Sequence, residues 1–166
     1  SARWNHDVPL DARRVGIVGT GSTAVQIVSA LADRVAKLEL FQRTAQWIMP
    51  GMNPAYGEQE LAEFRRNPQL MHTLHKDLSR LFAENFSNAV VNANSPGMKL
   101  IEDTCRANLE TNVKDAVLRE RLRPSYRAAC KRLIFSPDFY AAIQKPNEEL
   151  VTEGIERVES RGVRTR

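Results

Sequence analysis

Long apolar runs, cysteine and blocks of one charge are all scarce in this chain of 166 residues. No stretch approaches the ~20 apolar residues that a membrane-spanning helix needs, so no membrane partner is expected. The only two cysteines, Cys105 and Cys130, lack the spacing of metal ligands, which predicts reduced thiols in a cytoplasmic protein and no metal site. The basic residues are scattered, so the net charge of +4 does not predict a nucleic-acid partner.

The most informative stretch lies near the start of the chain. Val15 to Val18 is a short apolar run typical of a buried parallel strand. Gly19, Gly21 and Ala24 follow it and give the pattern G-x-G-x-x-A. Apolar residues then recur at helical spacing, at Val25, Val28, Leu31 and Val35.

A strand, a glycine turn and a helix in this order are typical of a dinucleotide-binding site. Gly19 permits the tight turn, Gly21 lets the backbone approach a pyrophosphate, and Ala24 lets the helix pack closely. The free N–H groups at the helix start, around Ser22 and Thr23, then face the phosphates. The alternative is a glycine-rich turn in another kind of α/β domain.

The second strand, predicted over residues 37–42, indicates which dinucleotide is bound. An NAD site has an acidic residue at the end of this strand, but Glu39 lies inside it. The strand instead ends at Arg43 and Thr44, and a guanidinium pairs with a phosphate in a bidentate fork. The sequence therefore favours NADPH over NADH, and the alternative is that Arg43 is a solvated charge.

The middle segment, residues 51–127, is rich in helix formers and reads as a helical insertion. After a loop at 50–54 we predict a helix over 58–64, a second one that opens at Pro68, and a long one from Lys99 to Leu122. Two histidines, His72 and His75, lie three residues apart. Without a third ligand nearby, they indicate solvated or capping side chains rather than a metal site.

Strand character returns in the last segment, residues 128–166. We predict a strand at 133–135, a helix with Ser136 as its cap and Pro137 at its first position, and a strand at 150–152. A β-hairpin with its turn at 161–162 follows. The fold class is thus α/β, with a Rossmann-like dinucleotide-binding domain formed by residues 1–50 and 128–166 around the insertion.

Three motifs together resemble a known family: G-T-G-S-T-A-V-Q from Gly19, F-Q-R-T-A-Q-W from Phe41, and C-K-R-L-I-F from Cys130. The chain resembles the NADPH domain of Baeyer–Villiger monooxygenases, which are class B flavoprotein monooxygenases. The resemblance implies that Arg43, Thr44 and Lys131 bind the 2′-phosphate. It also implies a pyrophosphate and ribose site, formed by Gly19, Thr20, Gly21, Ser22, Thr23 and Gln26.

The resemblance also implies a reaction. Arg132 would be the catalytic arginine that contacts flavin and nicotinamide and stabilises a C4a-peroxyflavin, which attacks a ketone to give an ester or lactone. By spacing alone, Lys131 and Arg132 read as ordinary surface charge. Trp4 matches the end of a family fingerprint, but Asn5 stands where proline or aspartate is usual, which keeps N- or S-oxygenation open as an alternative.

The chain contains one glycine fingerprint and no second, so we expect FAD to bind only in a longer parent protein. The isolated chain is then inactive, and a strand missing from its sheet leaves an open edge through which a homodimer is possible. A further alternative is a non-enzymatic helical module whose basic face meets an acidic partner.

Overall fold

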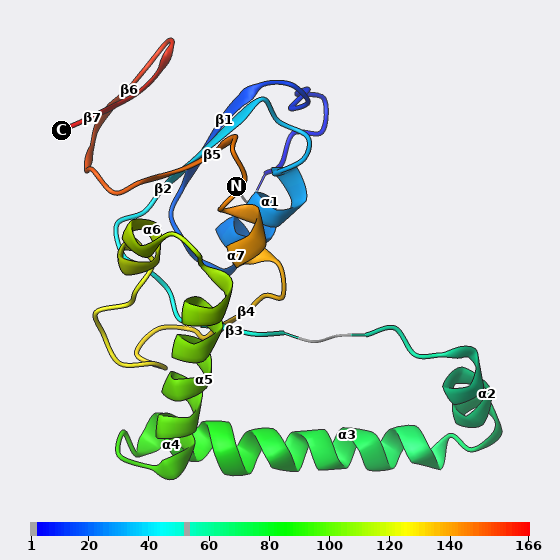
Figure 1. Ribbon diagram of the computed structural model, residues 1–166. Helices are drawn as coiled ribbons and strands as arrows, with labels where there is room; N and C mark the ends of the chain where they lie inside the picture. The colour runs from blue at the N-terminus through cyan, green and yellow to red at the C-terminus, as the bar shows by residue number, and fades with distance from the viewer. Residues whose placement is uncertain (1–2, 52–53) are drawn as a thin grey trace.

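The centre of the computed structural model, which describes residues 3–51 and 54–166, is a parallel sheet with the strand order β1-β2-β5 (Figure 1). Its strands are β1 (Arg14–Val18), β2 (Lys37–Phe41) and β5 (Glu148–Val151). In the register Val18 lies opposite Phe41, and Phe41 lies opposite Val151, so the three strands end at one edge. In open α/β sheets ligands bind beyond the carboxyl ends of the strands, so this edge is where a site is expected.

The helix that follows the glycine turn, α1 (Ser22–Leu31), packs its apolar face on this sheet. Val28 of the helix and Leu38 and Leu40 of β2 are completely buried where the two elements meet. Val35, the last residue of the apolar repeat, lies just past the helix end and is still buried. Apolar burial of this kind, at roughly 25 cal/mol per Å², fixes the turn between β1 and α1 against the sheet.

The middle of the chain forms helices, as the sequence predicts. They are α2 (Glu58–Arg66), α3 (Gln69–Leu81), the π-helical turn η1 (Phe82–Ser87), α4 (Asn88–Val91), α5 (Pro96–Asn112) and α6 (Ala116–Arg121). The expected helix after Pro68 is confirmed, and α3 extends away from the sheet with α2 at its far end (Figure 1). Two residues of the loop expected at 50–54 lie outside the described residues. That these helices form an insertion stays a prediction.

The single long helix expected from Lys99 to Leu122 is wrong, because the chain forms α5 and α6 with a break between them. The helix also starts three residues earlier than expected, at Pro96. At the break, Val113 is extended and its side chain is fully buried in the core. Asp115 then caps α6, since its carboxylate accepts a hydrogen bond of 2.6 Å from the N–H of Leu118. Burial of Val113 and this cap outweigh the helix propensity of the segment.

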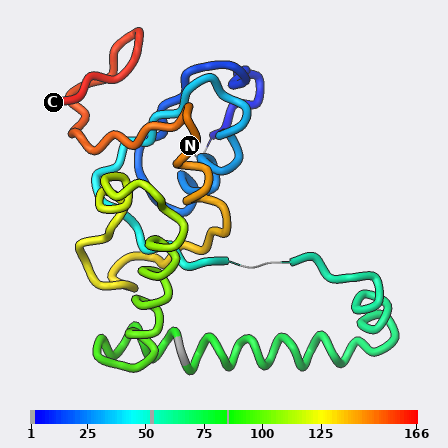
Figure 2. Tube along the Cα trace, in the orientation of Figure 1, coloured from blue at the N-terminus to red at the C-terminus, as the bar shows by residue number. Residues whose placement is uncertain are grey.

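Two segments far apart in the sequence meet beside the sheet. The strand expected at 133–135 is confirmed as β4 (Ile134–Phe135), which pairs in parallel with β3 (Ile48–Met49). Figure 2 shows the chain returning at this point to lie beside the segment that follows β2. The pairing carries residues 128–132 back to the end of the sheet where β1 and β2 finish.

The helix expected near Pro137 differs in one respect. Ser136 does act as a cap, because its hydroxyl accepts a hydrogen bond of 3.1 Å from the N–H of Phe139. The helix α7 (Phe139–Ala142), however, begins two residues after Pro137. The expectation that proline takes the first helical position is therefore wrong, and Asp138 stands at the boundary instead.

The chain ends in the predicted β-hairpin, formed by β6 (Ile155–Glu159) and β7 (Gly162–Thr165). With the parallel sheet and the covering helices, the hairpin confirms the α/β fold class expected from the sequence. Among the helices of the described residues, none combines the length and the apolar character that a membrane span requires.

Candidate functional site

The site is built on the glycine turn between β1 and α1. Gly19 has φ +99°, a backbone conformation that residues with a Cβ rarely adopt. Its N–H donates a hydrogen bond of 2.9 Å to the carbonyl of Phe41. A Cβ placed on Gly21 would meet no described atom within 4 Å. The backbone at Gly21 therefore borders open space, into which a ligand can approach closely.

The N-terminus of α1 faces the same space without a cap. Gly21 stands at the cap position, where the described residues supply no side-chain hydrogen bond to the first turn. The first turn begins with Ser22 and Thr23 and carries no acidic residue. Free N–H groups and the positive end of the helix dipole therefore point outward, which suits an anion such as a phosphate group.

A first cleft of about 700 Å³ opens on the β2 side of the glycine turn. The residues that line it and could contact a ligand include Gly19, Thr20, Arg43, Thr44, Lys131 and Arg166. Among its described lining residues are three basic side chains and one acidic side chain, Glu153. The carboxylate of Glu153 lies 3.6 Å from Arg121, so the cation compensates it and the cleft keeps a positive excess.

The acidic residue of β2 lies away from this cleft. The carboxylate of Glu39 is 3.0 Å from the ammonium of Lys37 and 3.6 Å from the guanidinium of Arg14. Glu39 lies inside the strand, as the sequence predicts, and these surface ion pairs occupy its carboxylate. The end of β2 therefore presents Arg43 and Thr44 to the cleft, and Glu39 is not among the residues that line it.

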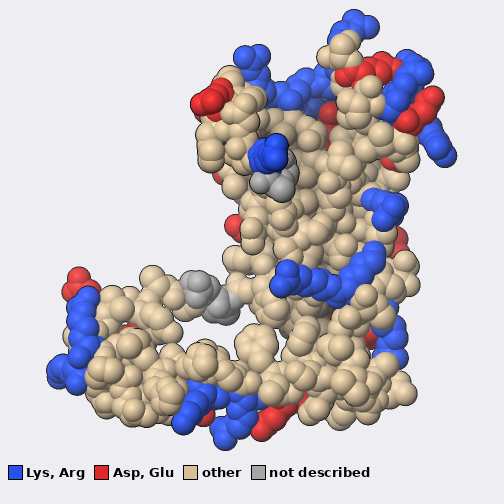
Figure 3. Space-filling view, turned by 180° about the vertical axis from the view of Figure 1, so that it is seen from behind, with Lys and Arg blue, Asp and Glu red and all other residues tan. Residues whose placement is uncertain are grey.

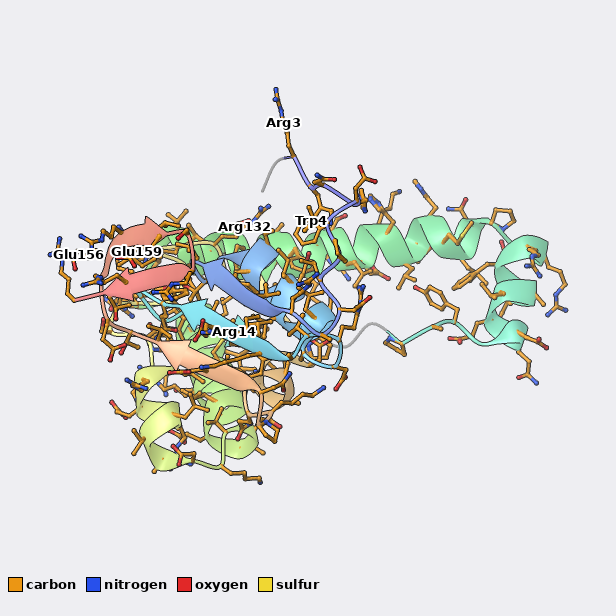
Figure 4. All side chains as sticks on the ribbon, turned by 90° about the horizontal axis from the view of Figure 1, so that it is seen from above. Arg3, Trp4, Arg14, Arg132, Glu156 and Glu159 are labelled. Carbon is orange, nitrogen blue, oxygen red and sulfur yellow. The ribbon has the colours of Figure 1, made fainter. Side chains whose placement is uncertain are left out.

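A second cleft of about 930 Å³ lies on the α1 side of the turn. Its lining includes Trp4, Gly21, Ser22, Thr23, Lys131 and Arg132. In Figure 4, Arg132 and Trp4 lie near the same side of the sheet, by β1. Lys131 and Arg132 are the charged residues of this lining within the described chain, so both clefts attract anions.

Thr20 is used inside the protein. Its side chain is buried, and its hydroxyl donates a hydrogen bond of 2.8 Å to the carbonyl of Thr44. This bond ties the glycine turn to the segment that carries Arg43. The structure thus gives Thr20 a role in shaping the cleft.

The structure brings most of the predicted site residues together, although they come from three separate stretches of sequence. Nine of the ten predicted residues line one of the two clefts, and Gln26 is the exception. Gln26 is exposed on α1, outside the lining as the described residues define it. Sequence reasoning missed Gln46, which lines both clefts, and Arg166. Gln46 lies two residues after Thr44, within the motif that begins at Phe41, so the sequence offered a local signal for it, whereas Arg166 reaches the site only through tertiary contacts.

The charge distribution is uneven. On the face shown in Figure 3, lysine and arginine side chains form several separate groups with acidic side chains between them.

No group of three or more metal-ligating side chains occurs in residues 3–51 and 54–166. A parallel sheet, an uncapped helix N-terminus and two cationic clefts at the strand ends together define a Rossmann-like domain whose glycine turn is suited to an anion.

Comparison with known proteins agrees with this class. No protein-family model matches the chain. An uncharacterized monooxygenase of Mycobacterium tuberculosis strain H37Rv is 47% identical over 99% of this chain and 33% of its own length. A Baeyer-Villiger monooxygenase of Streptomyces coelicolor is 37% identical over 95% of this chain and 30% of its own. The chain thus spans about a third of the length of the curated relatives it matches.

Solved structures show the same fold. Cyclohexanone monooxygenase from Rhodococcus sp. Phi1 bound to NADP+ superposes with a TM-score of 0.79 at 22% identity, over 99% of this chain and 37% of that one. The OTEMO complex with FAD and NADP superposes with a TM-score of 0.77 at 23% identity, over 99% of this chain and 38% of that one. The resemblance to Baeyer–Villiger monooxygenases that the three motifs predict is therefore confirmed over nearly the whole chain.

Proposed function

We propose that this chain is the NADPH-binding part of an FAD-dependent monooxygenase. The observation that carries the proposal is the pair of cationic clefts on either side of the uncapped N-terminus of α1. A dinucleotide phosphate has a pyrophosphate at its centre and a further phosphate on one ribose. The glycine turn suits the pyrophosphate, and the first cleft suits the phosphate on the ribose.

The individual roles follow from position. The free N–H groups at Ser22 and Thr23 receive the pyrophosphate, and the open space at Gly21 lets it approach the backbone. Arg43 pairs with the 2′-phosphate, and Lys131, which lines the same cleft, supplies a second cation. The hydroxyl of Thr44 adds a hydrogen-bond donor beside Arg43.

Arg132 lies in the second cleft, beyond the N-terminus of α1. When bound in the longer protein, NADPH supplies a hydride and FAD supplies the reaction with oxygen. The guanidinium of Arg132 would stabilise negative charge that develops next to it. We therefore assign Arg132 as the catalytic residue of this chain.

The substrate is a property of the longer parent protein, of which this chain is one part. We propose that the parent inserts oxygen into a ketone to give an ester or lactone, because two relatives carry the name Baeyer-Villiger monooxygenase. These names favour ketone oxygenation over N- or S-oxygenation and over a helical interaction module. Product analysis on matched ketone, amine and sulfide substrates tests this in the full-length protein, where oxidation of the amine or sulfide alone refutes it.

Calorimetric titration of the chain with NADP+ and NAD+ tests cofactor binding. We expect NADP+ to bind at least tenfold more tightly, a difference of about 1.4 kcal/mol. Arg43→Ala removes the bidentate partner of the 2′-phosphate, so the preference for NADP+ is lost while NAD+ affinity stays. Arg66→Ala is the matched control, because it removes the same charge from exposed α2. Equal loss for both dinucleotides in Arg43→Ala refutes its assignment to the 2′-phosphate.

Two further expectations concern the oligomeric state and the cellular location of the protein. In the described part of the sheet β1 is an edge strand, paired only with β2, so a second chain could pair with its free side. We propose a homodimer through this edge, and light scattering after size-exclusion chromatography tests it, since a monomeric mass refutes it. Cytoplasmic location rests on the cysteine content and stays a prediction.

A further inference from the structure

Lys131 lies where the two clefts meet, and it is the one predicted site residue besides the glycines that lines both. A lysine side chain has four flexible carbons, so its ammonium does not hold one position without a neighbour that fixes it. Here the ammonium nitrogen Nζ lies 4.6 Å from the centre of the Tyr126 ring. At this distance the negative face of an aromatic ring attracts a cation.

Tyr126 is itself held at two points, its backbone carbonyl and its phenol. The carbonyl of Tyr126 accepts a hydrogen bond of 2.8 Å from Nε1 of Trp47, which is buried. The phenol donates a hydrogen bond of 2.7 Å to Oε1 of Gln46. Burial raises the pKa of Tyr126, so the phenol stays neutral and remains a donor at physiological pH. The ring therefore has a fixed place beneath the ammonium.

The same contacts lead on to the glycine turn. Nε2 of Gln46 lies 3.5 Å from the hydroxyl oxygen of Thr20, and that hydroxyl donates to the carbonyl of Thr44. One set of contacts thus connects Thr44, which follows Arg43, to the Tyr126 ring below Lys131. These contacts therefore connect the backbone next to Arg43 with the ring that lies against the Lys131 ammonium.

The segment that carries Lys131 is also strained. Ala129 has φ 62°, a left-handed conformation that a residue with a Cβ rarely adopts. Strain of this kind persists where the surrounding structure over-determines the backbone, and it concentrates at functional sites. Around Ala129, Glu102 of α5 supplies such a constraint, because its carboxylate accepts a hydrogen bond of 3.2 Å from the N–H of Ala128.

From this geometry we propose that Tyr126 is a positioning residue, which holds the Lys131 ammonium at the junction of the clefts and so strengthens the preference for a 2′-phosphorylated dinucleotide. The identity of the ligand rests on the function proposed above. The position of the ammonium rests on the contacts of Tyr126 alone. These two parts can therefore fail separately.

The first test measures dissociation constants for NADP+ and NAD+ in three variants of the chain. Tyr126→Leu removes the ring, and we expect NADP+ affinity to fall about fivefold while NAD+ affinity changes little. Tyr126→Phe keeps the ring and loses only the phenol, so most of the preference remains. Tyr56→Leu is the matched control, because Tyr56 is an exposed tyrosine whose ring contacts Phe64, and it leaves both affinities unchanged.

A substitution that changes the charge distribution of the Tyr126 ring and keeps its shape closely similar distinguishes an electrostatic role of the ring from a purely structural one. We compare Tyr126→Phe with Tyr126→pentafluorophenylalanine, whose fluorines reverse the charge on the ring face. The account predicts a further loss of NADP+ preference in the fluorinated variant. Equal preference in the two variants overturns the proposal, and this comparison stays decisive if Tyr126→Leu does not fold.

The second test reads the contact without any dinucleotide. In NMR spectra of chain with ¹³C-labelled lysine, ring current shifts the Hε protons of Lys131 upfield, and the shift disappears in Tyr126→Leu but persists in Tyr126→Phe. An unshifted Lys131 signal in the unaltered chain overturns the proposal. If the shift is present and the chain binds NAD+ as tightly as NADP+, the proposed function fails and the role in selectivity falls with it, while the contact stands.

Discussion

Glu148 at the start of β5 leads to the sharpest prediction on stability. Both oxygens of its carboxylate are shielded from solvent, and within the described residues neither has a hydrogen-bond partner. Burial raises the pKa of Glu148 from its ordinary 4.5 to about 7, although the nearby Lys145 ammonium acts in the opposite direction. The folded chain therefore binds a proton at Glu148 that the unfolded chain has already released between pH 4.5 and 7.

The sign of the effect follows from this difference. Because the folded state holds more protons in that window, the free energy of unfolding falls as pH rises from about 4.5 to 7. A shift of this size corresponds to about 3 kcal/mol. Glu148 is only half-buried as a whole, so solvent screening reduces the effect to about 1–2 kcal/mol.

The perturbation is Glu148→Gln, which keeps the shape and removes the charge. Urea unfolding followed by circular dichroism should show a gain of about 1–2 kcal/mol at pH 8 and only about a quarter of that at pH 5, where the glutamate of the folded chain is protonated. Glu149→Gln is the matched control, because Glu149 is exposed, its carboxylate lies 2.6 Å from Lys37, and its pKa is lowered. A gain for Glu148→Gln that is the same at both pH values would refute the reasoning.

Three further changes test single contacts. Ala129→Gly relieves the left-handed backbone and should raise stability by about 0.5–1 kcal/mol in thermal unfolding, so a lower midpoint contradicts the strain argument. Asp115→Ala removes the cap on the N–H of Leu118 and should cost about 1 kcal/mol, while Asp115→Asn keeps most of it. Thr20→Val loses the hydrogen bond to Thr44 and should cost about 1 kcal/mol and weaken NADP+ binding, whereas Thr20→Ser, which keeps the hydroxyl, should bind normally.

The sequence predicts well the parts of the fold that local chemistry decides. The strand–turn–helix unit around Gly19 depends on a short apolar run and on a backbone angle that glycine adopts easily, and both are visible in the chain. The hairpin follows from Gly162, whose φ of 155° lies at its turn. The expected 2′-phosphate residues Arg43 and Thr44 reach the cleft because they directly follow a correctly predicted strand.

The sequence did not predict the features that depend on contacts between residues far apart along the chain. The break between α5 and α6 occurs because Val113 is buried in a core formed mostly by other segments, while the local residues favour a helix. The two-residue strand β3 exists only through its pairing with β4, about 85 residues away along the chain. Arg166 likewise reaches the site through tertiary packing, so its own neighbours in sequence give no signal.

The central claim is that a phosphorylated dinucleotide binds at the glycine turn and in the first cleft. Titration of ¹⁵N-labelled chain with NADP+, followed by NMR, tests this claim most directly. We expect NADP+ to shift the amide signals of Gly21, Ser22, Thr23 and Arg43 together until they saturate, and NAD+ to leave the Arg43 signal nearly unshifted. Saturating shifts confined to α2 and α3, or identical shifts at Arg43 with both dinucleotides, would contradict it.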